Sequence, residues 1–110
     1  MRTLAADLDG TIYKGNTLLP KVKETYHVLK QLEINTIFIT NNSSQTPEEI
    51  KTKLDKLLQD KISLKNIITP LMIIKNVSEL TTLKVHVYGS SGVKNYLEQF
   101  NEKIVSIQEA

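Results

Sequence analysis

Thr-Leu-Ala-Ala-Asp-Leu-Asp-Gly-Thr, residues 3–11, is an apolar run that ends in two acidic residues and a glycine. The run has the composition of a short buried strand, and Gly10 supplies the backbone freedom for a tight loop after it. Acidic residues two positions apart, just past a strand, can lean into one crevice as the chain curls away. We therefore expect Asp7 and Asp9 to lie together at the carboxyl end of a strand.

Helical and strand patterns alternate along the rest of the chain. The segment Thr46-Pro47-Glu48-Glu49 combines a capping threonine, a proline at the first helical position and a glutamate three residues after the cap, so it predicts a helix start. This alternation predicts an α/β fold, a Rossmann-like parallel sheet with helices on both faces, in one domain. The other expected elements are helices from Pro20, from Pro70 and over 93–100, and strands at 36–40, 66–69, 84–88 and 103–107.

Composition excludes several classes of protein. The 14 Lys and Arg against 12 Asp and Glu leave a charge of only +2, which argues against nucleic acid as a partner. The absence of cysteine excludes disulfides and thiolate metal sites. We find neither a signal peptide nor an apolar run of the roughly 18 residues that cross a bilayer, so we expect a soluble cytoplasmic protein with no membrane partner. The lysines at 51, 53 and 56 are expected to line the solvent face of their helix.

The chemistry is expected at the strand ends, because ligands of open α/β sheets bind beyond the carboxyl ends of the strands. Thr40, Asn41 and Asn42 follow the second predicted strand and offer a hydroxyl and two amides there. Two nearby carboxylates repel each other, and a divalent cation or a shared proton relieves that repulsion. Mg²⁺ prefers such oxygen ligands and often shares them with substrate phosphate oxygens, so the pattern predicts phosphoryl transfer.

At this point the sequence resembles a known family. Asp7-Leu-Asp-Gly-Thr11 resembles the first signature motif of the haloacid dehalogenase (HAD) superfamily, and Ile39-Thr-Asn-Asn42 resembles the second. The runs 38–47 and 87–92 are similar to subfamily IIA, which contains 4-nitrophenylphosphatases, sugar-phosphate phosphatases and nucleotide phosphatases. The resemblance implies that residues 1–110 form the N-terminal part of a HAD-like core domain, before the cap domain.

The resemblance also implies a role for each motif residue. Asp7 would attack phosphorus and form an aspartyl-phosphate, and Asp9 would act as the general acid and base. Mg²⁺ would be bound by the side chain of Asp7 and the backbone carbonyl of Asp9. Residues 13–16 would belong to a mobile flap, and the substrate would be a small phosphorylated metabolite, a sugar phosphate or a nucleotide. The residues implied to bind the phosphoryl group are Thr40, Asn41 and Gly10.

The sequence also departs from this subfamily. Its members continue through a cap domain to a lysine that bridges nucleophile and phosphate, and then to a Gly-Asp pair that completes the magnesium site. This sequence ends at Ala110 and contains no Gly-Asp dipeptide. We therefore expect weak or no activity from this chain alone. The alternative is a non-catalytic module that binds Mg²⁺ or phosphate, or a half-site completed by a partner chain. A second copy of the chain is a possible partner, which would give a homo-oligomer.

Two further interpretations fit parts of the sequence. A phosphorylated receiver domain also forms an aspartyl-phosphate on a parallel sheet, but it needs an acceptor Asp at the end of a later strand, and the predicted strands here have none. The segment 89–92 lies between a strand and a helix and could cradle a phosphate. It lacks the spacing of the dinucleotide and P-loop motifs, so we expect a structural turn.

Overall fold

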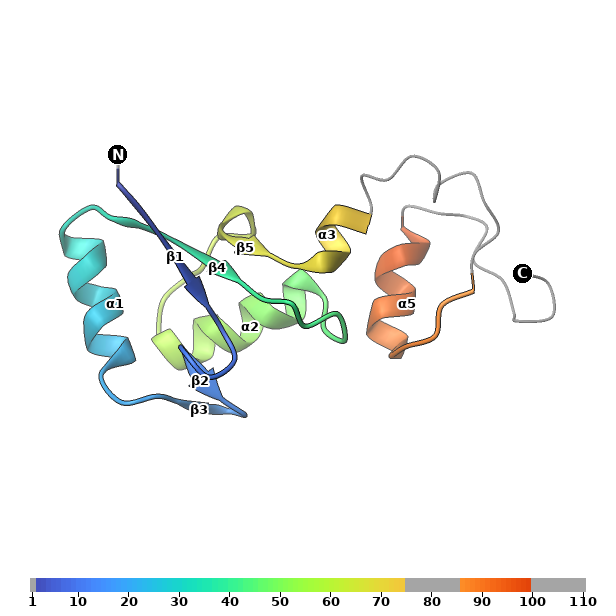
Figure 1. Ribbon diagram of the computed structural model, residues 1–110, viewed down its shortest axis with the longest axis horizontal. Coiled ribbons are helices and arrows are strands. Elements are labelled where there is room, and N and C mark those ends of the chain that lie inside the picture. The colour runs from blue at the N-terminus through green and yellow to red at the C-terminus, as the bar shows by residue number, and fades with distance from the viewer. Residues whose placement is uncertain (1, 75–85, 100–110) are drawn as a thin grey trace. The chain divides into compact units, whose positions relative to one another are not determined.

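The computed structural model describes residues 2–74 and 86–99 (Figure 1). The chain divides into two compact units, which are described separately below. The first comprises Met1–Thr40 and Glu48–Ile68, and the second comprises Asn41–Pro47 and Thr69–Ala110. Within the described residues, no helix is both long and apolar enough to cross a bilayer.

The first unit is built on a parallel sheet. Among the described residues its strands lie in the order β1 (Thr3–Asp7), β4 (Asn35–Ile39) and β5 (Ile67–Ile68), with β4 in the middle (Figure 1). β1 and β4 run parallel, and β4 pairs with β5 in the same direction. The predicted α/β class with a parallel sheet and helices is therefore confirmed.

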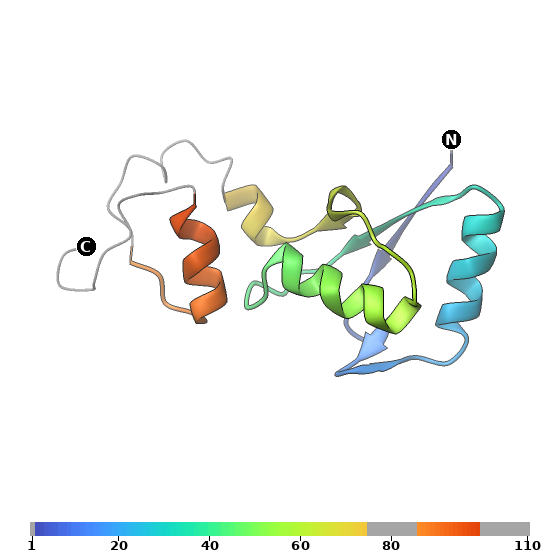
Figure 2. The ribbon, with the colours of Figure 1, turned by 180° about the vertical axis from the view of Figure 1, so that it is seen from behind.

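Two helices pack against the sheet and contribute to the apolar core of this unit. α2 (Pro47–Leu58) begins at the proline that the sequence indicated, and its buried leucine and isoleucine side chains pack with Phe38 of β4. Figure 2 shows α1 (Val22–Gln31) in blue and α2 in green. The side chains that α1 contributes to the same cluster are only partly buried. The cluster contains Leu8, Tyr13, Phe38, Ile50, Leu54, Leu58, Ile62 and Ile67.

α1 differs from its prediction at both ends. It begins at Val22 rather than at Pro20, because Lys21 has a left-handed backbone (φ 65°) that a helix cannot contain. The helical spacing of Val22, Tyr26, Leu29 and Leu32 predicts that they share one apolar face. Leu32, however, is the residue after the last turn, and its side chain is 64% exposed. The helical spacing predicted the central contacts, whereas the helix ends depend on the local backbone.

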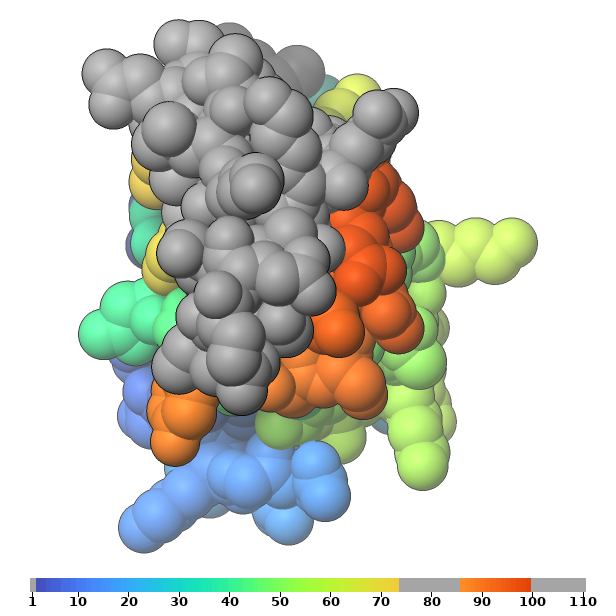
Figure 3. Space-filling model, turned by 90° about the vertical axis from the view of Figure 1, so that its right-hand side faces the viewer, coloured from blue at the N-terminus to red at the C-terminus, as the bar shows by residue number. Residues whose placement is uncertain are grey.

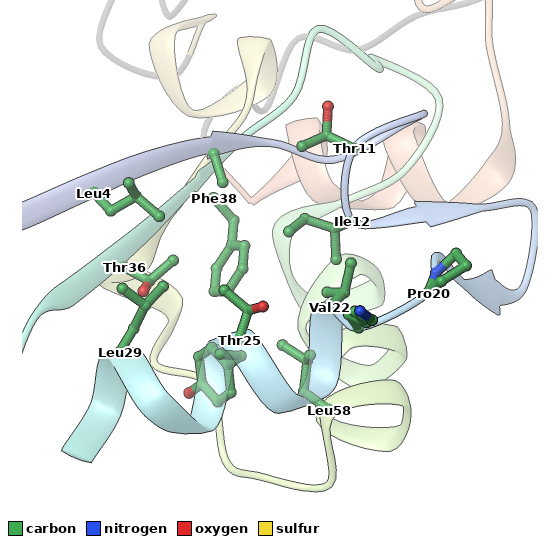
Figure 4. Close-up of a pocket in the computed structure, with 13 residues that line it drawn as sticks. Leu4, Thr11, Ile12, Pro20, Val22, Thr25, Leu29, Thr36, Phe38 and Leu58 are labelled. Carbon is green, nitrogen blue, oxygen red and sulfur yellow. The ribbon is translucent and has the colours of Figure 1, made fainter. Parts of the chain in front are cut away.

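An apolar pocket of about 240 Å³, partly open to solvent, lies between α1 and the sheet. Leu4 and Phe38 line it from the strands, and Val22 and Leu29 line it from the helix (Figure 4). No residue of α1 is fully buried. The helix is therefore packed more loosely than α2, and polar bonds at its far end contribute to its attachment. The hydroxyl of Tyr26 and the ammonium of Lys30 both donate to Asp60 Oδ2, at 2.7 and 2.6 Å.

A small antiparallel hairpin was not predicted. It consists of β2 (Tyr13–Lys14) and β3 (Thr17–Leu18), and Gly15 in its turn has a φ of 62°. The family resemblance had placed residues 13–16 in a mobile flap. Here they form a paired turn with Tyr13 buried in the core.

The second unit contains α3 (Pro70–Ile74) and α5 (Ser91–Glu98), and its apolar cluster joins Leu71 to two residues of α5, Val93 and Tyr96. The exposed side of α5 is visible in Figure 3. α5 begins two residues before its predicted start, because the hydroxyl of Ser90 caps it by accepting from the N–H of Val93.

Some predicted strands differ from the structure. The strand expected at 66–69 is reduced to β5, which follows the short 3₁₀ helix η1 (Leu64–Asn66). The strand expected at 84–88 is not formed in its described part, residues 86–88. The strand expected at 103–107 lies outside the described residues.

Candidate active site

The parallel pairing of β1 and β4 brings two predicted site residues to the same edge of the sheet. Asp7 is the last residue of β1 and pairs with Ile39, the last residue of β4. Thr40 follows directly, is buried, and donates its backbone N–H to the carbonyl of Ile68 at 3.1 Å. The backbones of Asp7 and Thr40 therefore lie at neighbouring strand ends, where ligands of α/β sheets bind.

Asp9 is held by a compact loop that follows β1. The carbonyl of Leu8 accepts from the N–H groups of Thr11, Ile12 and Tyr13, at 3.2, 2.9 and 3.3 Å. The N–H of Gly10 donates to the carbonyl of Tyr13 at 2.8 Å, and the φ of 84° at Gly10 permits this turn. The loop thus closes on itself immediately beside Asp9.

Both carboxylates stay accessible because the residue between them is buried. The side chain of Leu8 is completely buried in the core, whereas Asp7 and Asp9 on either side of it are exposed. Gly10, the third residue of the motif, is exposed beside them.

Tyr13 lies next to this acidic pair although the sequence did not indicate it. Its side chain is only 1% exposed. Burial raises the pKa of Tyr13, and the negative charges of Asp9 and Asp7 raise it further. The phenol is therefore within electrostatic reach of both carboxylates.

A lysine of α2 covers the Tyr13 ring. The ammonium of Lys53 lies 3.7 Å from the ring centroid, which is cation–π geometry. The expectation that Lys53 lines the solvent face was wrong, since its side chain is half-buried. The sequence does carry a signal for this half-buried position. Lys53 stands three residues after the buried Ile50, so both residues lie on the same side of the helix.

Asn41 and Asn42 belong to the second unit and are considered there. Asn41 is exposed, and the side-chain oxygen of Asn42 accepts from the N–H and the hydroxyl of Ser44 at 2.8 and 2.6 Å. The hydroxyl of Ser90 donates to the carbonyl of Ser44 at 3.1 Å. The segment containing Ser90 therefore braces a loop and caps α5, as expected of a structural turn.

The sequence of residues 4–103 matches the family described as haloacid dehalogenase-like hydrolase. The chain belongs to this hydrolase family. The match spans both motifs and the whole first unit from Leu4 onward. It favours the hydrolase interpretation over the receiver-domain alternative.

Several relatives of this chain are phosphatases by name. An acid sugar phosphatase of Staphylococcus saprophyticus is 32% identical over 95 residues, which are 83% of this chain and 36% of the relative. The 5'-nucleotidase YutF of Bacillus subtilis is 28% identical over 97 residues, 84% of this chain and 37% of the relative. The chain thus spans little more than a third of the length of these curated relatives.

Solved structures share the fold of this chain. A hypothetical protein of Pyrococcus horikoshii superimposes with a TM-score of 0.77 at 32% identity, covering 99% of this chain and 42% of the other. A 4-nitrophenylphosphatase of Thermotoga maritima gives a TM-score of 0.74 at 23% identity, with coverage of 100% and 42%. At that identity the second likeness shows the fold alone.

The donor set at the strand ends fits a hard divalent cation. The chain presents two exposed carboxylates, Asp7 and Asp9. Mg²⁺ is commonly held by one or two carboxylates plus substrate oxygens. Within residues 2–74 and 86–99, no group of three or more acidic, histidine or cysteine side chains is close enough to form a closed metal cage. The set therefore fits a cation shared with a ligand better than one enclosed by protein.

Proposed function

We propose that the chain carries the nucleophile half of a Mg²⁺-dependent phosphomonoester hydrolase. The observation that carries this proposal is the β1–β4 register, which sets Asp7 opposite Ile39 and so brings the acidic loop and Thr40 to neighbouring strand ends. The two motifs of the hydrolase family thus meet at one edge of the sheet. Residues 1–110 would form the N-terminal part of the core domain.

Each residue has a role that its chemistry allows. Asp7 would attack phosphorus through a carboxylate oxygen while the bond to the leaving oxygen breaks, which gives an aspartyl-phosphate. Asp9 would donate a proton to that leaving oxygen and later accept one from the attacking water. Thr40, Asn41 and Gly10 would donate hydrogen bonds to the phosphoryl oxygens. A bound Mg²⁺ would offset the negative charge of the acidic pair and the phosphoryl group.

The proposed substrate is a small phosphorylated metabolite, a sugar phosphate or a nucleotide. Support comes from the names of the matching relatives, an acid sugar phosphatase and a 5'-nucleotidase. Support for Mg²⁺ comes from the two exposed carboxylates, Asp7 and Asp9, because this ion prefers carboxylate oxygens as ligands. We propose a cytoplasmic setting, in which such metabolites are available.

We expect turnover by these 110 residues alone to be weak or absent. The sequence offers no residue that we can assign to the bridging lysine or to the second acid, so charge around Asp7 would be less compensated. A half-site that binds Mg²⁺ or phosphate and is completed by a partner chain is therefore the second candidate.

Beryllofluoride, which mimics a phosphoryl group on a carboxylate, tests the nucleophile without requiring turnover. In the presence of Mg²⁺, ¹⁹F NMR should show an adduct with the parent chain and with Glu24→Gln, which removes an exposed acid elsewhere in the first unit. Asp7→Asn should show none. Hydrolysis of 4-nitrophenyl phosphate, measured alongside, separates the candidates: an adduct without turnover favours the half-site. An adduct that persists in Asp7→Asn, or is absent from the parent chain, would refute the proposal.

A further inference from the structure

Lys53 is the cationic side chain that the structure places beside the acidic loop. Its ammonium lies 3.7 Å from the centroid of the Tyr13 ring, and among the described residues it has no carboxylate within ion-pair distance. Lys30 and Lys51, by contrast, are each paired with an aspartate. The charge of Lys53 is therefore not neutralised locally by an ion pair.

Tyr13 connects that cation to Asp9 through the backbone. Its carbonyl accepts from Gly10 at 2.8 Å, its N–H donates to Leu8 at 3.3 Å, and it forms an isolated bridge with Asp9 itself. The ring is buried in the core while the backbone closes the loop. A displacement of the ring would thus displace the loop that carries Asp9.

We propose that Lys53 is a positioning residue for Asp9, and that it acts by holding the Tyr13 ring between its ammonium and the core so that the loop over residues 8–13 stays closed. This inference rests on the proposed function, because that function makes Asp9 the general acid and base. The physical contact itself does not depend on that function. It joins α2 to the acidic loop within one compact unit.

The position of the Lys53 ammonium over the Tyr13 ring also affects the electrostatics of this region. The ring that Lys53 covers is the same one whose pKa is raised by burial and by the charges of Asp9 and Asp7, so ammonium and carboxylates act on one small region. A cation in this region attracts an approaching phosphate dianion.

Amide hydrogen exchange measures the closed loop directly. In Lys53→Met the amides of Gly10 and Ile12, which donate within the loop, should exchange about tenfold faster, because the cation–π contact that opposes opening is lost. Lys53→Arg, which keeps a cation for the ring, should restore slow exchange. Lys56→Met is the matched control, since Lys56 is an exposed lysine on the same helix. The amide of Thr40, bonded to Ile68, reports global opening.

The pattern of exchange decides the matter. Faster exchange confined to Gly10 and Ile12 supports the proposal. Unchanged exchange in Lys53→Met, or acceleration of equal size at Thr40, overturns it, because the lysine would then have no effect or only a general stabilising one. If the beryllofluoride adduct fails to form on Asp7 but the loop amides still respond, the proposed function fails while the contact survives.

A second measurement uses the leaving group, in any form of the enzyme that turns over. An alkyl phosphate such as glycerol phosphate needs protonation of its leaving oxygen, whereas 4-nitrophenol leaves readily without it. Lys53→Met should lower kcat/KM about tenfold for the alkyl ester and by a factor of about two for the aryl ester, as expected when a general acid is displaced. Equal losses for both esters would contradict an effect through Asp9.

Discussion

Asp60 offers the sharpest test of how the first unit is stabilised. Its carboxylate accepts from the ammonium of Lys30 at 2.6 Å, from the hydroxyl of Tyr26 at 2.7 Å and from the N–H of Lys61 at 2.8 Å. These bonds, led by that from Lys30, lower the pKa of Asp60 from 3.8 to about 2. Asp60→Asn removes the negative charge but keeps an oxygen that can accept from Tyr26 and Lys61.

The magnitude follows from the difference in pKa. A fall from 3.8 to about 2 corresponds to about 2.4 kcal/mol of stability at neutral pH. The Lys30 side chain is 58% exposed and that of Asp60 is 19% exposed, so solvent screens the pair. We therefore expect Asp60→Asn to lower the free energy of unfolding by about 1 kcal/mol at pH 7.

The sign of the pH dependence is fixed by the lowered pKa. The contribution of Asp60 is present above pH 3.8, where the carboxylate is charged in both states, and it is lost as the pH falls towards 2. The deficit of Asp60→Asn should hold between pH 7 and pH 4.5 and shrink by roughly half at pH 3. Urea denaturation of both proteins across this range measures it.

Glu24→Gln is the control for Asp60→Asn, and two outcomes would contradict the prediction. Glu24→Gln removes an exposed acid of α1 and should change stability little at any of these pH values. A deficit of Asp60→Asn that is the same at pH 7 and pH 3 would show that the lost charge is not its cause. Full stability of the variant at pH 7 would show that screening cancels the pair entirely.

Two substitutions test packing and backbone strain, both by chemical denaturation. Leu54→Ala removes a completely buried side chain from the core and should lower the free energy of unfolding by about 2–5 kcal/mol. Leu32→Ala, at a 64% exposed position, should change it by no more than about 0.5 kcal/mol. Similar values for both variants would mean that α2 is not packed as described. Gly10→Ala meets no heavy atom within 4 Å but must keep a φ of 84°, so strain alone should cost about 1–2 kcal/mol. Gly89→Ala, where φ is not positive, should be close to neutral, and an equal cost at both glycines would contradict the strain argument.

Local signals account for the parts of the fold that the sequence predicted. The capping threonine and proline before α2 act within one turn, so they set the start of that helix without help from the rest of the molecule. Apolar β-branched runs likewise indicated β4, which forms one residue earlier than expected. The left-handed Lys21 and the hairpin at Gly15 arise from backbone turns that carry weak side-chain signals.

The candidate site, like the fold, could be predicted from the sequence only in part. The arrival of Asp7 and Thr40 at one edge could be predicted, because parallel strands in a sheet present their carboxyl ends together. The contact of Lys53 with Tyr13 could not, because it joins residues 40 positions apart through a loop conformation. Helical spacing placed Lys53 beside the apolar stripe, but its charge favoured a solvent-facing interpretation. Long side chains such as lysine can cover buried rings while keeping the ammonium at the surface.

The pocket beneath α1 has a consequence for which substitutions this unit tolerates. Its lining is mostly apolar, its volume is about 240 Å³, and it is partly open to solvent. A larger apolar side chain that extends into this space would gain buried area without displacing core atoms. The same enlargement at a completely buried position of α2, such as Leu54, would force neighbouring side chains apart. The underside of α1 is therefore the place where this unit has room for a bulkier residue.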